Sequence, residues 1–289
     1  MGPGRAAGGG LREFDSSLLE VLAKQRKWRD VRREAEAMIG RGGRQRSLSP
    51  DVYLATACAE LGDATAALAA LQPLDDVKAD GMVWAKLQRP RVLNLLGRHD
   101  QAAAECDKLL TAYPRPSDAR RVRLQLSEAY LGLKEYAKAE AELRAILDHD
   151  PDDVLALNNL GYNLADQGRN LAEAEELVRR AVELDGAERR RAGGPDAENG
   201  VYLDSLGWVL FRRGKLPEAR RLLERATGLP DSASDAVVWD HLGDVCFRLG
   251  DVPAAVRAWE AAKELYADSH QGRQGGRRDE VTRKLRQVR

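Results

Sequence analysis

The sequence predicts an all-α protein built as a solenoid of repeated helix pairs, and two observations support this fold class. Ala and Leu dominate a chain in which only 5% of the residues are aromatic, which favours close-packed helices over a β-rich fold. A pattern of small and large apolar residues also recurs, with 34 residues from Ser127 to Gly161 and 36 from Gly207 to Gly243. A period of this length indicates an array in which each unit packs on its neighbours.

Each repeat is predicted to begin with a helix whose apolar residues lie three and four positions apart, and therefore on one face. A small residue on that face, such as Gly161 or Gly207, allows a partner helix to come close. The first helix should end at a glycine, as at Gly168, because the left-handed backbone there requires no Cβ. The second helix then presents Ala, a large apolar residue and Ala to its neighbours.

These residues resemble the tetratricopeptide repeat consensus, most closely from Asp150 to about Tyr266. The matching stretches are LNNLGYNLADQG, YLDSLGWVLFRRGKLPEA and WDHLGDVCFRLGDVPAAVRAWEAA. They look like the terminal repeats of large bacterial tetratricopeptide proteins, some of which are envelope-associated. The resemblance implies a right-handed α-solenoid of about seven tetratricopeptide-like helix pairs with a C-terminal capping helix, acting as a protein-interaction scaffold.

The chain is expected to divide into four parts. Residues 1–15 form a disordered N-terminal segment, 16–116 degenerate repeats, 117–267 well-formed repeats, and 268–289 a linker and a basic capping helix. In the degenerate part, Pro90 should kink a helix or delay its start, because proline removes a backbone donor. In the capping helix, Val281, Leu285 and Val288 share one apolar face.

One segment departs from the repeat. Residues 186–200 insert about eleven residues between two units, and their Gly, Pro and Arg content predicts an exposed loop. Gly186 stands where a repeat would usually close with proline. We interpret the insertion as a tolerated surface feature rather than a functional loop.

No catalytic motif is present, so we expect no enzyme activity, no cofactor and no metal site. Cys58, Cys106 and Cys246 lie far apart and occupy positions where other repeats carry core residues, which favours buried free thiols. His241 has Asp240 and Asp244 beside it, but without a partner nucleophile we interpret it as a surface residue of a helix.

Charge and hydropathy limit the cellular setting. The 46 basic and 46 acidic residues cancel, and no apolar stretch reaches the roughly 20 residues that span a bilayer. We therefore expect a cytoplasmic protein. A misassigned start codon that removed a signal peptide would leave the same evidence, and the chain would then be an envelope-assembly adaptor.

The candidate binding site lies on the first helices of the last repeats, because the resemblance to tetratricopeptide arrays implies that these helices line a concave groove. The resemblance also implies that the residues facing this groove lie two positions before and one position after each Leu-Gly pair, and again about four positions further on. This groove is acidic with aromatic anchors, which favours a basic or aromatic-containing partner segment. The selected residues are Asn158, Tyr162, Asp204, Trp208, Arg212, Asp240, Asp244, Phe247 and Arg248.

Three alternatives stay open. The rings of Tyr162 and Trp208 could pack against neighbouring helices instead of a ligand. The Arg-rich segments, including Arg189 to Arg191 and the tail, could contact nucleic acid, although no aromatic residue is interleaved for base stacking. The chain could also self-associate, with Trp84 marking the surface.

Overall fold

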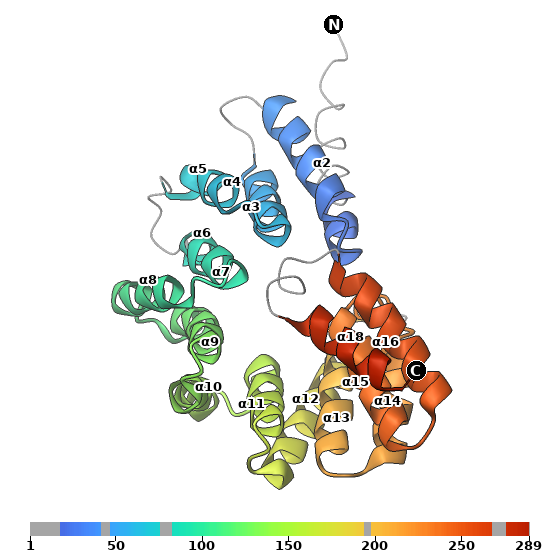
Figure 1. The fold of residues 1–289 in the computed structure, drawn as a ribbon. Coiled ribbons are helices and arrows are strands. Elements are labelled where there is room, and N and C mark those ends of the chain that lie inside the picture. Colours follow the sequence, from blue (N-terminus) through green and yellow to red (C-terminus); the bar gives the residue numbers. More distant parts are fainter. Residues whose placement is uncertain (1–17, 42–46, 76–82, 194–197, 268–275, 289) are drawn as a thin grey trace, which may run out of the picture. The chain divides into compact units, whose positions relative to one another are not determined.

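The structure is a computed structural model that describes residues 18–41, 47–75, 83–193, 198–267 and 276–288. Within these ranges the chain forms helices and turns and contains no strand (Figure 1), so the predicted all-α class is confirmed. Two compact units cover Met1–Tyr113 and Pro114–Arg289. The expected disordered segment at 1–15 and most of the expected linker lie outside the described residues.

The first unit consists of short antiparallel helices. Residues 18–24 are helical, α2 packs against α3, and α7 packs against α8. The apolar interior is built around small residues such as Ala55 and Ala57, which allow close helix contacts. The helices are α2 (Trp28–Arg41), α3 (Ser49–Leu61), α4 (Ala64–Ala69), α5 (Gln72–Asp75), α6 (Val83–Lys86), α7 (Gln88–Leu95) and α8 (His99–Ala112).

The interruption expected at Pro90 is present. Helix α6 ends at Lys86 and α7 begins at Gln88, so Pro90 falls in the first turn of α7. A missing backbone N–H costs little there, because the first turn of a helix has no intrahelical acceptors for its donors. The late helix start is therefore confirmed.

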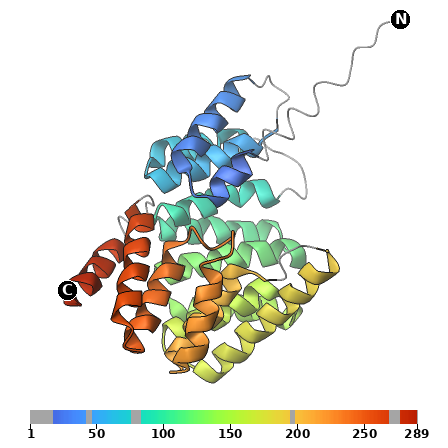
Figure 2. The same cartoon turned by 90° about the vertical axis from the view of Figure 1, so that its right-hand side faces the viewer.

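The described residues of the second unit form four helix pairs and a final helix, and the arrangement of these helices can be followed in Figures 1 and 2. In each pair the two helices pack on one another. The first helices α11, α13 and α15 also contact the second helix of the preceding pair. The number of about seven pairs for the whole chain and the right-handed superhelix stay predictions. The helices are α9 (Pro116–Gly132), α10 (Tyr136–His149), α11 (Val154–Asp166), α12 (Leu171–Arg191), α13 (Gly200–Arg212), α14 (Leu216–Ala226), α15 (Ala236–Arg248), α16 (Val252–Ala267) and α18 (Arg277–Gln287).

Glycine permits the close packing within these pairs. A Cβ atom added at Gly161 would lie 2.5 Å from Cγ2 of Val178 and 2.8 Å from the Ala174 carbonyl oxygen. At Gly243 it would lie 2.3 Å from the Trp259 ring. The predicted role of the small residue is confirmed. The predicted helix end is confirmed as well, since Gly168 has a φ of 69° just after α11.

The expected loop over residues 186–200 is partly wrong. Helix α12 continues to Arg191 and carries Gly186 as a buried residue within it. The side chain of Arg189 donates to Asp185 at 2.8 Å, four residues earlier, and Arg and Glu are good helix formers. These local contributions offset the cost of about 1 kcal/mol for one internal glycine. Residues 194–197 lie outside the described part, and α13 begins at Gly200.

The three cysteines are buried and form no disulfide bond, as predicted. Burial raises the pKa of the Cys58 and Cys246 thiols above the usual value. A raised pKa reduces the thiolate fraction, so these residues act as small apolar side chains of the core rather than as nucleophiles.

Candidate functional site

Three residues occupy equivalent positions on α11, α13 and α15, two before each Leu-Gly pair. Asn158, Asp204 and Asp240 are all buried, so the packing of the second unit covers the positions that the sequence assigned to a groove. We call the side of α11, α13 and α15 that carries these residues, with Tyr162, Trp208 and Asp244, the first-helix face.

Asp204 is buried because it pairs with a histidine from the next repeat. Nδ1 of His241 on α15 lies 2.9 Å from Oδ1 of Asp204 on α13. His241 is only 3% exposed, so its expected place on the surface is wrong. Burial opposes protonation of the imidazole, but the carboxylates of Asp204, Asp240 and Asp244 outweigh it and raise the pKa of His241.

The aromatic residues of the first-helix face gather around the same histidine. The Trp208 ring stacks on His241 with centroids 4.1 Å apart, and the Tyr162 ring lies 6.2 Å from it. One face of Trp208 is therefore engaged in packing between α13 and α15. Among the described residues, neither Nε1 of Trp208 nor Oδ1 of Asn158 has a hydrogen-bond partner, and both atoms are buried.

The two aspartates of α15 bind a lysine from the C-terminal helix. Nζ of Lys284 lies 2.8 Å from Oδ1 of Asp240 and 2.6 Å from Oδ1 of Asp244. Nε1 of Trp259 donates to the same Asp244 oxygen at 3.0 Å, and the Lys284 Nζ lies 5.8 Å from the centre of the Trp259 ring. Burial raises the pKa of Asp240, and Lys284 opposes that rise. We call Asp240, Asp244 and Trp259 the lysine pocket.

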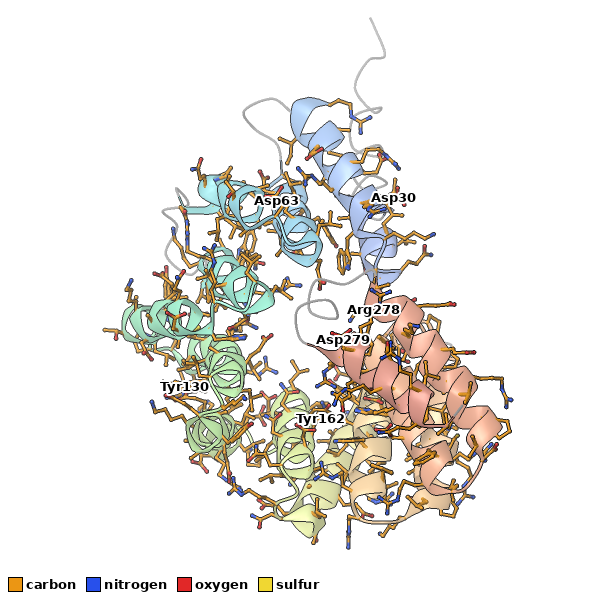
Figure 3. All side chains as sticks on the ribbon, viewed as in Figure 1. Asp30, Asp63, Tyr130, Tyr162, Arg278 and Asp279 are labelled. Atoms are coloured by element: carbon orange, nitrogen blue, oxygen red, sulfur yellow. The ribbon has the colours of Figure 1, made fainter. Side chains whose placement is uncertain are left out.

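The first turn of α18 reaches toward α11. Arg277 interacts electrostatically with the hydroxyl groups of Tyr162 and Tyr266, and its neighbours Arg278 and Asp279 are labelled with Tyr162 in Figure 3. Burial raises the pKa of Tyr162 well above its usual range. Helix α18 thus lies across residues of α11, α15 and α16, and the amphipathic capping helix expected from Val281 and Leu285 is present with both residues buried.

The remaining predicted residues lie toward the ends of α13 and α15. Nη1 of Arg212 donates to the Asp166 carbonyl oxygen at 2.7 Å, and its guanidinium lies over Trp208. Phe247 is 44% exposed, and the guanidinium of Arg248 lies over the Phe211 ring. Phe247 and Arg248 are therefore exposed to solvent. Arg212 instead connects α13 to α11 of the adjacent repeat.

A cleft that the sequence interpretation missed lies between α9 and α11. Its volume is about 320 Å³, and Leu155 on its wall is 40% exposed. The same register applied to the pair Leu126-Ser127 selects Leu124 and Glu128, so the signal was present but in a weaker match to the consensus. The lining residues are Leu124, Gln125, Ser127, Glu128, Leu131, Leu155, Asn159 and Asn163.

No group of three or more His, Cys, Asp or Glu residues in the described ranges is arranged to hold a metal ion. Of the helices described, none is long and apolar enough to cross a membrane.

Comparison with protein families gives four matches, all to models described as tetratricopeptide repeat. They cover residues 48–73, 93–161, 152–231 and 205–270. The TPR repeat-containing protein PA4667 of Pseudomonas aeruginosa is 32% identical over 49% of this chain. The match spans 28% of the length of that relative.

Solved structures share the fold at low sequence identity. A tetratricopeptide repeat protein from Parabacteroides merdae superposes with a TM-score of 0.59 and 16% identity over 97% of this chain and 99% of its own. The APC/C hetero-tetramer Cut9-Hcn1 gives a TM-score of 0.62 with 16% identity over 89% and 46%. PilW, a type IV pilus biogenesis factor, gives 0.52 with 18% identity over 66% and 82%.

Proposed function

This chain belongs to the tetratricopeptide repeat family, whose members are in general protein-interaction scaffolds, and we propose that it binds a segment of a partner protein along its first helices. The open part of the binding surface is the cleft between α9 and α11, whereas helix packing and α18 cover the first-helix face. The chain performs no catalysis in this role and needs no cofactor, because recognition rests on burial, charge and hydrogen bonding.

The observation that carries the proposal is the lysine pocket. Asp240 and Asp244 lie four residues apart on α15 and hold the ammonium group of Lys284 between them. A cation on an amphipathic helix is thus the kind of group that this surface accepts, which supports a basic partner segment.

The cleft between α9 and α11 supplies the apolar and polar contacts that such a segment requires. Leu124, Leu131 and Leu155 line it with aliphatic surface, and Asn159 and Asn163 add side-chain amides. Amides donate and accept hydrogen bonds, so they suit the backbone of a bound peptide. The three leucines lie together on the wall of the cleft, and contiguous apolar surface of this kind often marks a protein contact.

Contact with nucleic acid receives less support. Of the Arg-rich segments, Arg189 pairs with Asp185, and Lys284 of the tail is held by Asp240 and Asp244. Cations already neutralised by carboxylates release few counterions on binding a phosphate backbone.

The test is photo-crosslinking from a photo-reactive residue placed at Asn163, which lines the cleft, in a lysate of the native organism, with capture identified by mass spectrometry. The variant Leu155→Arg places a charge in the cleft, and Leu133→Arg is the matched control because Leu133 is 39% exposed but does not line the cleft. A partner retained by wild type and Leu133→Arg but lost from Leu155→Arg supports the proposal. Equal capture by all three proteins refutes it.

A further inference from the structure

Helix α18 buries few residues compared with α15, the helix that holds the lysine pocket. Val281 and Leu285 are the buried residues of α18, whereas eight residues are buried in α15. The stability of a segment follows the apolar surface that it buries, so α18 should open at a lower free-energy cost than α15. Its attachment depends strongly on Lys284 in the lysine pocket.

The lysine pocket requires a cation while a helix covers it. Asp240 has a side chain 6% exposed, and Asp244 accepts hydrogen bonds from both Lys284 and Trp259. A carboxylate that is this buried is costly without a partner charge. When α18 leaves, water reaches both carboxylates, so any other helix that covers them must bring a cation for them to remain ionised at low cost.

We propose that α18 is an exchangeable occupant of the lysine pocket, and that a basic amphipathic helix of a partner protein replaces it there. The proposal rests on the proposed function and specifies its partner. In the free protein α18 limits access to α15. The free energy needed to displace α18 therefore lowers the apparent affinity of the partner.

The contacts of α18 define what the replacing helix must carry. A lysine enters between Asp240 and Asp244, and apolar residues three positions before it and one after it take the places of Val281 and Leu285. An arginine seven positions before the lysine takes the place of Arg277 near Tyr162. Charge complementarity selects this helix, because the surface that it meets carries two aspartates within one helical turn.

The experiment uses the full chain and a labelled synthetic peptide with the sequence of residues 276–288. Peptide binding is measured by fluorescence anisotropy to wild type, Lys284→Glu and Arg283→Glu. The Lys284→Glu change removes the cation from the pocket, while Arg283→Glu makes the same charge change on an exposed residue of the same helix. We expect binding to Lys284→Glu to be at least about 10-fold tighter than to the other two proteins, because an attached occupant competes at a high effective concentration.

A second peptide with glutamate at the position of Lys284 should show no binding to any of the proteins. Equal affinity of the first peptide for Lys284→Glu and Arg283→Glu overturns the proposal, as does binding of the glutamate peptide. Dimers of wild type, detected by light scattering, also overturn it, because the replacing helix is then that of a second copy.

Hydrogen exchange on wild type tests the proposal without the Lys284→Glu variant, and it therefore applies even if that variant fails to fold. The amides of α18 should exchange at least about 10-fold faster than those of α15. Equal protection of α18 and α15 would identify α18 as a permanent part of the core and overturn the proposal. Capture of a partner that is lost from Leu155→Arg would then still uphold the proposed function, so the two can fail separately.

Discussion

Nδ1 of His241 on α15 lies 2.9 Å from Oδ1 of Asp204 on α13, and the Trp208 ring stacks on the same imidazole. Both residues are buried, so this pair connects two adjacent repeats through the interior rather than through the surface. Sequence motifs placed Asp204 and Trp208 in a ligand groove, whereas the structure shows that each also packs against His241.

The first prediction concerns the pH dependence of stability. The pKa of His241 in the folded protein is raised above its unfolded value of about 6.5, chiefly by Asp204 acting against burial, with Asp240 and Asp244 adding to it. Its stabilising contribution is therefore complete below about pH 6.5 and lost as the pH rises through the folded pKa. Wild type should lose stability over that window, and His241→Asn should not.

Urea unfolding at about pH 6 and about pH 9 measures this difference, and each unit of pKa elevation is worth about 1.4 kcal/mol. His149→Asn serves as the control, because His149 is exposed at the end of α10. If wild type and His241→Asn lost stability equally between the two pH values, the Asp204–His241 pair would not be the cause.

The second prediction concerns helix packing at Gly161. Gly161→Ala forces a Cβ against the Ala174 carbonyl oxygen and the Val178 side chain, and the carbonyl belongs to a helix backbone that cannot rotate away. We expect a net loss of about 1–3 kcal/mol in the free energy of unfolding, measured by urea denaturation. Gly40→Ala meets nothing within 4 Å in α2 and should be neutral or stabilising. A neutral Gly161→Ala would show that α11 and α12 can separate at little cost.

The third prediction concerns the charge balance of the lysine pocket. Lys284→Ala leaves Asp240 and Asp244 without their cation and should destabilise the protein by about 1–3 kcal/mol. Asp240→Asn added to Lys284→Ala should recover part of that loss, because it removes one buried charge. Arg283→Ala should change stability by less than about 0.5 kcal/mol. Additive effects of Lys284→Ala and Asp240→Asn in a double-mutant cycle would show that the two side chains do not interact.

The fourth prediction concerns the thiols. Cys58, Cys106 and Cys246 are buried, so a thiol reagent such as DTNB should reach them only when the surrounding helices open. Labelling in native buffer should be at least about 100-fold slower than in urea, since each factor of ten corresponds to about 1.4 kcal/mol of opening free energy. Leu249→Cys introduces a 37% exposed position and should react at once. Rapid native labelling of all three original thiols would contradict their role in the core.

The local features of the fold followed from the sequence because each depends on residues within one or two helices. The glycines that end helices, the small residues at Gly161 and Gly243, the buried cysteines and the late start of α7 at Pro90 are set by backbone sterics and by the 3.6-residue period. The extension of α12 through Gly186 was missed because glycine suggested a helix end, while the Arg and Glu residues after it favoured continuation.

The sequence by itself determined the repeat, the family resemblance and the amphipathic C-terminal helix, since these depend on periodicity alone. Only the tertiary structure decided that His241 is buried against Asp204, and that Lys284 lies between Asp240 and Asp244, 44 and 40 residues away along the chain. The physical reason is that burial and charge pairing depend on which helices pack together. A residue's position on its own helix leaves that choice open until the neighbouring repeats are in place.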